Sequence, residues 1–167
     1  MKVTIIGKGS GWEDAPYNGE CWGITQLILR RPVTRVVDMN NYSLWGAIEE
    51  EEAQLARQKA LDTGVKYVDL TNYPLSSIIE YFDTDFFSNT VDYAIALALY
   101  EGCTELCMYG VNMASPGEYA YQQSGVNFWC GMAMGLGVKV KVFGEISTIM
   151  RTKDGLLYGY SSPQIRR

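Results

Sequence analysis

The sequence predicts one α/β domain built on a mostly parallel β-sheet, and three observations support this class. Short apolar runs that suit strands alternate along the chain with longer stretches that suit helices. The first run is apolar throughout, which is typical of a strand covered on both faces. Glycine and small polar residues follow the runs, where the strands of such a sheet would end. The length of 167 residues fits a single domain, residues 1–167, with a full core.

Six strands are expected, and the character of each run indicates its place in the sheet. The first run suits a central strand, whereas the last alternates valine with lysine and suits a position near the edge. With helices between them, these strands predict a Rossmann-like three-layer sandwich. A small C-terminal β-hairpin should follow, with its turn at Lys153-Asp154-Gly155. The strands are expected at Val3–Ile6, Cys21–Ile24, Arg35–Met39, Val65–Leu70, Leu106–Val111 and Val138–Val142.

Three helices are expected, and their ends are set by polar caps and glycines. Residues 71–87 form a long connection rich in aromatic side chains between the first helix and the second. The third helix is apolar almost all round, so it is either buried within the domain or a subunit contact in a homo-oligomer. The helices are expected from Ser43 to Gly64, from Ser88 or Asn89 to Gly102, and from Glu118 to about Gly137.

The composition excludes several kinds of chemistry and partner. The chain has no histidine, which rules out a histidine base, a Ser-His or Cys-His nucleophile and histidine metal ligands. The net charge is −5 without a basic stripe, so duplex nucleic acid is not an expected partner. No run is long enough to span a bilayer, and the N-terminus resembles no signal peptide. A cytoplasmic location is therefore expected, with reduced thiols at Cys21, Cys103, Cys107 and Cys130.

The strongest local signal for a ligand site is the loop Gly7-Lys8-Gly9-Ser10-Gly11 directly after the first strand. Glycine lets a phosphate approach backbone N–H groups closely, and anions bind at such strand ends in open α/β sheets. The loop is neither a P-loop nor a dinucleotide fingerprint, because the required glycine spacing is absent. A tight turn needed only for the path of the chain is the alternative. Trp12, which follows, is left open between stacking on a base and packing in the core.

Further polar residues follow the other expected strands or open the helices. Each alone is explained by ordinary caps and turns, but their shared location at one edge of the sheet predicts a ligand site. Asp38, Glu118 and Tyr119 are the candidates for a catalytic role. The candidate ligand-binding residues, besides the glycine loop and Trp12, are Thr25, Asp38, Asn40, Ser88, Asn89, Thr90, Asn112, Tyr119 and Tyr121.

The segments Val3–Ser10, Ser88–Asn112 and Glu118–Tyr121 together resemble the Rossmann-like bacterial sialyltransferases and the related family that contains archaeal 6-hydroxymethylpterin diphosphokinase. The likeness lies in the strand with its glycine loop, the helix with its following strand, and a tyrosine near nucleotide phosphate. The catalytic histidine of the sialyltransferases has no counterpart here. The resemblance implies a cytidine-nucleotide pocket formed by Gly7, Gly9, Ser10, Thr25, Ser88–Thr90, Asn112 and Tyr119.

A second set of segments is similar to a family of Rossmann-like proteins of tailed phages. This resemblance covers nearly the whole chain and implies a viral protein that acts in the host cytoplasm, but it implies no particular activity. The segments are Gly11–Pro16, Trp22–Ile24, Tyr109–Val111 and Asp154–Tyr160.

Three functions remain in competition. The first is a protein that binds a nucleotide or nucleotide-sugar without consuming it. The second is a glycosyltransferase-like enzyme acting on a nucleotide-activated donor, with Asp38 or Glu118 as base. Lys8 and Tyr119 would then stabilise the leaving phosphate. The third is an interaction protein with a vestigial site. No protein metal site is expected, and Mg²⁺ would enter only with phosphate.

Overall fold

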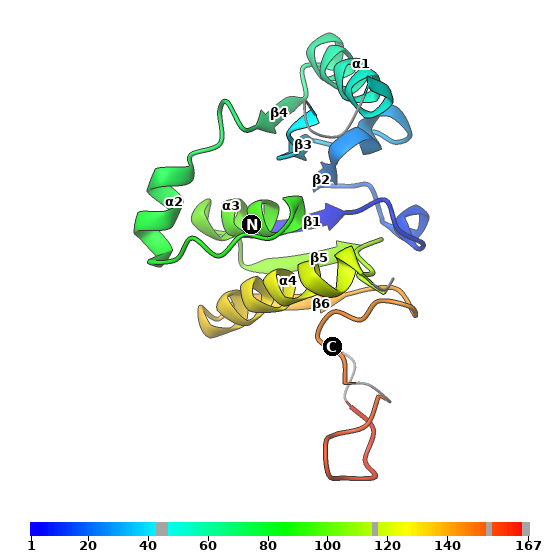
Figure 1. Cartoon of the computed structure of the whole chain (residues 1–167), viewed down its shortest axis with the longest axis vertical. Helices are drawn as coiled ribbons and strands as arrows, with labels where there is room; N and C mark the ends of the chain where they lie inside the picture. The colour runs from blue at the N-terminus through cyan, green and yellow to red at the C-terminus, as the bar shows by residue number, and fades with distance from the viewer. Residues whose placement is uncertain (43–46, 115–116, 153–154, 165–167) are drawn as a thin grey trace.

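The structure is a computed structural model that describes residues 1–42, 47–114, 117–152 and 155–164. It confirms the α/β class: all strand pairs of its six-stranded sheet are parallel, in the order β4-β3-β2-β1-β5-β6 (Figure 1). Each strand overlaps a predicted one, and the valine–lysine strand forms an edge as expected. The strands are β1 (Lys2–Ile6), β2 (Glu20–Ile24), β3 (Arg35–Asp38), β4 (Lys66–Asp69), β5 (Glu105–Tyr109) and β6 (Lys139–Val142).

Four α-helices and two 3₁₀-helices are found in the described chain. α1 (Ala47–Thr63), α3 (Thr90–Tyr100) and α4 (Glu118–Gly135) confirm the predicted helices, while the predicted Ser43 cap lies outside the described residues. α2 (Leu75–Phe82) was not predicted and lies in the expected connection, although Leu75, Ile78, Ile79 and Phe82 follow helical spacing. The expected alternation also fails early, since the connections after β1 and β2 contain only η1 (Trp12–Asp14) and η2 (Thr25–Leu29).

Two hydrophobic clusters, one on each face of the sheet, hold the layers together. On one face, Val3 and Leu106 pack with α3 and α4, and Figure 1 shows these helices side by side across the strands. On the other face, Val36 packs with Ala56 and Ala60 of α1. α4 buries its inner side but leaves other apolar residues partly exposed, so a subunit contact through α4 stays a prediction.

The C-terminal segment lies beyond β6 and adds no strand to the sheet (Figure 1). It forms a minimal hairpin in which Leu156 and Pro163 make an isolated antiparallel bridge. The predicted turn at Lys153-Asp154 lies outside the described residues, and the observed turn comes later, where the N–H of Tyr160 donates to the carbonyl of Leu157. Within the described chain, none of the helices combines the length and apolar character needed to cross a bilayer.

The strand order places a topological switch point between β1 and β5. The chain adds β2, β3 and β4 on one side of β1, then returns to add β5 and β6 on the other side. Connections therefore leave the carboxyl ends of β1 and β5 in opposite directions, and in open α/β sheets ligands bind at such a point. The glycine loop follows β1 and thus lies there.

Candidate functional site

The glycine loop packs directly against the chain that follows β5. The N–H of Gly7 donates to the carbonyl of Tyr109 at 2.8 Å, and the N–H of Gly9 donates to that of Gly110 at 2.9 Å. A Cβ atom at Gly7 or Gly9 would lie 2.5 or 2.7 Å from the carbonyl oxygen of Gly110. Gly110 itself has a φ of +63°. Glycine is therefore required at these positions because the two loops touch.

This packing leaves only part of the loop for an anion. The N–H groups of Gly7 and Gly9 are occupied by the protein. Within the described residues, no hydrogen bond is found for the N–H groups of Lys8, Ser10 and Gly11. Any phosphate bound by the loop would use these three amides.

Two buried side-chain oxygens flank the glycine loop without a hydrogen-bond partner. They are Thr25 Oγ1 and Asn112 Oδ1, and no other buried side-chain polar atom among the described residues is unpaired. Ile6 is in register with Gly23 and Tyr109, so Thr25 and Asn112 follow the strands on either side of β1. A buried unsatisfied polar atom costs about 1–3 kcal/mol and is uncommon in native proteins.

The backbone of Thr25 is also strained. Its φ is +54°, in the left-handed region that β-branched residues rarely adopt, and the residue is only 5% exposed. Strain of this kind costs about 1–3 kcal/mol and is found most often at functional sites. A buried, unpaired hydroxyl on a strained residue at a strand end therefore indicates a binding role.

Asn112 is held by its amide nitrogen. Asn112 Nδ2 donates to the carbonyl oxygen of Ser10 at 3.1 Å, which joins the chain after β5 to the glycine loop. A Cβ atom on Gly9 would lie 2.6 Å from the same nitrogen. The amide orientation is fixed by this bond, and the unpaired atom is the acceptor. We call Lys8, Gly9, Ser10, Thr25 and Asn112 the switch-point site.

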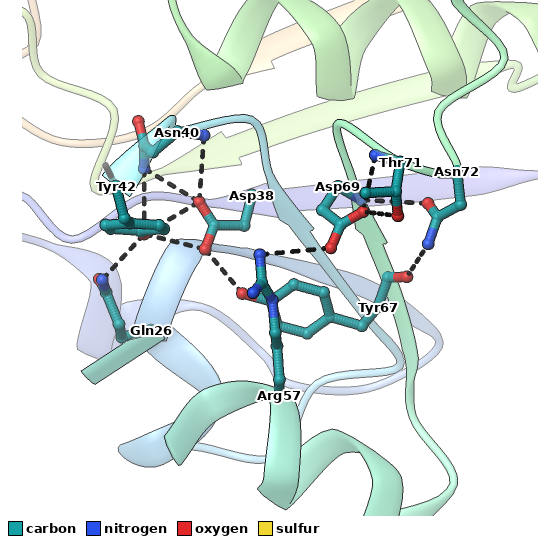
Figure 2. Close-up of polar contacts among 9 residues, drawn as sticks. All are labelled: Gln26, Asp38, Asn40, Tyr42, Arg57, Tyr67, Asp69, Thr71 and Asn72. Carbon is teal, nitrogen blue, oxygen red and sulfur yellow. Dashed lines mark hydrogen bonds and ion pairs between the residues drawn. The ribbon is translucent and has the colours of Figure 1, made fainter. Parts of the chain in front are cut away.

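A second polar cluster, Asp38, Asn40, Tyr42 and Tyr67, lies after β3 and on β4 (Figure 2). Asp38 is 1% exposed. Its Oδ1 accepts from Asn40 Nδ2 at 3.0 Å, and its Oδ2 accepts from the hydroxyls of Tyr42 at 2.9 Å and Tyr67 at 2.6 Å. Burial raises the pKa of both tyrosines, so they stay protonated as donors. We call these four residues the Asp38 cluster, in which the protein itself satisfies the carboxylate.

Lys8 connects the two groups of residues. Its Nζ donates to Gln26 Oε1 at 3.0 Å, and Gln26 Nε2 donates to the hydroxyl of Tyr42 at 3.0 Å. The predicted residues Lys8, Asp38 and Asn40 thus belong to one hydrogen-bonded network (Figure 2 shows its Gln26 end). The candidate list missed Tyr42 and Tyr67, because a tyrosine in a sequence gives no sign of whether its hydroxyl is buried.

Two of the three predicted residues at the start of α3, Ser88 and Asn89, have partners within the protein, and the third, Thr90, is buried. Asn89 caps the helix, because its Oδ1 accepts from the N–H groups of Val91 at 2.8 Å and Asp92 at 3.3 Å. Ser88 Oγ donates to Asp92 Oδ2 at 2.8 Å and contacts the carbonyl of Gln122 at 3.2 Å. Burial raises the pKa of Asp92 to about 6. The amides expected to receive an anion are therefore occupied, and these contacts join α3 to α4.

Of the remaining candidates, Trp12 packs beside Gly110, Tyr121 lies on the surface, and Glu118 and Tyr119 have side chains outside the described residues. Tyr121 is 77% exposed on α4. Trp12 lies with its ring 5.7 Å from the guanidinium of Arg31, which gives it a partner within the protein. Glu118 and Tyr119 open α4, but their side chains lie outside the described residues. In the part of the chain that the structure describes, no cluster of three or more cysteine or acidic side chains could hold a metal ion.

Two cavities of the described protein bear on the site, and one of them lies at the functional edge of the sheet. A cavity of about 340 Å³ is lined by Met134 and by Gly137–Lys141, at the amino end of β6. A cavity of about 210 Å³ lies beside the Asp38 cluster, at the carboxyl ends of β3 and β4. Ligands of open α/β sheets bind at carboxyl ends, so the smaller cavity is the one of interest.

Comparison with known proteins gives distant likenesses of structure. No protein-family model matches the chain, and no curated protein matches it in sequence. The sialyltransferase CstII from Campylobacter jejuni, in complex with the substrate analogue CMP-3FNeuAc, is 12% identical, with a TM-score of 0.42 over 89% of this chain and 83% of that chain. CstII in complex with cytidine-5′-monophosphate is 13% identical, with a TM-score of 0.40 over 88% and 81% of the two chains. At this level the chain is similar to CstII in general arrangement only, and no family is shown.

Proposed function

We propose that this chain binds a nucleotide or nucleotide-sugar at the switch-point site. The observation that carries the proposal is the pair of buried, unpaired oxygens of Thr25 and Asn112 on either side of the glycine loop. They follow β2 and β5, the two strands that flank β1, and so border the topological switch point, where open α/β sheets bind ligands. A ligand that hydrogen-bonds to both oxygens would remove the cost of leaving them unsatisfied.

The chemistry of the site suits a ligand with both an anionic and a neutral polar part. The unpaired amides of Lys8, Ser10 and Gly11 are donors that a phosphate would accept from. The Lys8 ammonium lies at the same loop and adds positive charge. Asn112 Oδ1 is an acceptor and requires a donor, such as a base amino group or a sugar hydroxyl. A nucleotide carries both kinds of group.

Binding, rather than transfer, is the function we propose. Asp38 was a candidate base for a transferase, but its carboxylate already accepts hydrogen bonds from two tyrosines and an asparagine. Proton abstraction by Asp38 would require these bonds to break. The role of an interaction protein with a vestigial site has no comparable support, because an unused site has no reason to keep a strained threonine with a buried hydroxyl.

Calorimetric titration with a panel of nucleotides and nucleotide-sugars tests the proposal. We expect heat of binding for at least one nucleotide, and a loss of about fivefold or more in affinity for Asn112→Leu, which removes both the unpaired acceptor and the amide donor to Ser10. Asn18→Leu, at an exposed position before β2, is the matched control and should bind as the wild type does. Absence of heat with every nucleotide at millimolar concentration would refute nucleotide binding.

A further inference from the structure

The cavity beside the Asp38 cluster has a rigid floor. Tyr42 and Asn40 line it, and both are held by the buried carboxylate of Asp38. The Asn40 amide nitrogen donates to Asp38 and lies 3.2 Å from the Tyr42 hydroxyl. Figure 2 shows the side-chain oxygen of Asn40 turned away from that carboxylate. These two lining side chains are therefore held in place by the protein itself.

Another part of the lining contains an ion pair and a hydrogen-bonded turn. Arg57 Nη2 lies 3.3 Å from Asp69 Oδ2, and the guanidinium lies 5.5 Å from the ring centre of Tyr67. Asp69 Oδ1 accepts from the N–H of Thr71 at 2.9 Å and from its hydroxyl at 2.6 Å (Figure 2). Arg57 keeps further N–H donors beyond this ion pair, because a guanidinium carries five.

The charges around the cavity argue against an anion. Glu50 and Asp69 line it together with one cation, Arg57, which is already paired with Asp69. A phosphate or carboxylate would meet a wall with a net negative charge. Hydroxyl groups both donate and accept, so they match a wall that mixes carboxylates, a guanidinium, an amide oxygen and a threonine.

We propose that this cavity binds an uncharged group rich in hydroxyls, such as a sugar ring. The cavity shares no residue with the switch-point site, because it lies at the ends of β3 and β4 whereas that site lies at the ends of β1, β2 and β5. The Lys8–Gln26–Tyr42 chain of hydrogen bonds runs from one to the other. The inference stands whether or not a nucleotide binds at the switch point.

NMR titration of the full chain with glucose and with glucuronate provides a matched pair of probes that differ in one carboxylate. We expect glucose, at tens of millimolar, to shift the side-chain amide of Asn40 and the backbone amides of Leu70 and Thr71, which line the cavity. Glucuronate should bind at least about fivefold more weakly, because the acidic wall repels it. Galactose and mannose are also uncharged and serve as further neutral probes of the same amides.

Two variants separate this proposal from other outcomes. Arg57→Gln removes the cation and should weaken glucose binding about fivefold or more. Arg30→Gln, exposed at the end of η2, is its control and should leave binding unchanged. The proposal is overturned if none of these neutral sugars shifts the cavity amides, or if glucuronate binds as well as glucose. Nucleotide binding would instead shift Gly9 and Asn112, so failure at one site can be told from failure at the other.

Discussion

The switch-point site and the Asp38 cluster lie at the same edge of one sheet but differ in how their polar atoms are satisfied. Each oxygen of the Asp38 carboxylate accepts hydrogen bonds from neighbouring side chains. Thr25 and Asn112, by contrast, each leave a buried oxygen unpaired. Both regions gave the same kind of signal in the sequence, namely polar residues after apolar strands.

The difference teaches which kind of polar cluster to regard as a binding site. The Asp38 carboxylate has a full set of partners and needs no ligand itself, so its part is to hold Asn40 and Tyr42 in place beside the cavity. An oxygen that lacks a partner, on a residue with a strained backbone, keeps its cost until a ligand or water binds. The contrast can be tested by substitutions whose effects on stability and binding should differ in size and sign.

Among these substitutions, Gly110→Ala should lower the free energy of unfolding most. A Cβ there would lie 2.7 and 2.9 Å from the carbonyl oxygens of Gly9 and Gly7, at a φ of +63°. Backbone oxygens cannot move aside cheaply, so we expect a loss of about 3 kcal/mol or more in the free energy of unfolding, measured in urea. Gly64→Ala has a φ of +69° but open space around the Cβ, and should lose only about 1 kcal/mol. Equal losses would contradict the close contact of the two loops.

The pH dependence of stability should report on Asp92, a third polar group. Burial raises the pKa of Asp92 from 3.8 to about 6 in the folded state. Between these two values the folded protein holds a proton that the unfolded chain has lost, so stability should fall as the pH rises through that window. A shift of this size corresponds to about 2–3 kcal/mol. Below the window both states are protonated, and the contribution of Asp92 is then fully present.

Chemical denaturation of wild type and Asp92→Asn across that range measures the effect. The variant cannot lose the proton, so its stability should fall less steeply with rising pH than that of the wild type. Parallel pH profiles would show that Asp92 has no raised pKa.

Tyr67→Phe should destabilise the Asp38 cluster by about 2 kcal/mol, because its hydroxyl donates to a buried carboxylate at 2.6 Å. Tyr73→Phe is a matched control, since the Tyr73 hydroxyl donates to a neutral carbonyl at 3.0 Å and should contribute about 1 kcal/mol. Thermal or urea unfolding of both variants measures the difference. A smaller loss for Tyr67→Phe than for Tyr73→Phe would mean that the cluster is not held by its charge.

Thr25→Val should change the free energy of unfolding least, and it is the substitution expected to raise it. Valine keeps the shape of threonine and removes the unpaired hydroxyl, so the variant should gain about 1 kcal/mol in unfolding free energy. If the hydroxyl contacts the ligand, nucleotide affinity should fall in the same variant. Thr34→Val should instead lose stability, because the Thr34 hydroxyl bonds the backbone of Cys21. A destabilised Thr25→Val protein would indicate that the hydroxyl is already satisfied.

Part of the candidate site could be read from the sequence, and part could not. The glycine loop and Asn112 were predicted because each follows a strand that is recognisable from its own residues. The partners of Asp38 were not all predicted, since Tyr67 lies 29 residues away and reaches the carboxylate only when β4 pairs with β3. The start of α3 was expected to be open, but Asn89 and Asp92 occupy it.

The sequence by itself determined the strands, the main helices and the places where polar residues leave them, because periodicity and capping depend on neighbours in the chain. The tertiary structure alone decided which of those polar residues have partners. That outcome depends on strand order and on contacts between loops such as those of Gly9 and Gly110, which join residues about a hundred positions apart. Local sequence patterns do not predict such contacts. The unpaired oxygens of Thr25 and Asn112 can therefore be identified only from the assembled sheet.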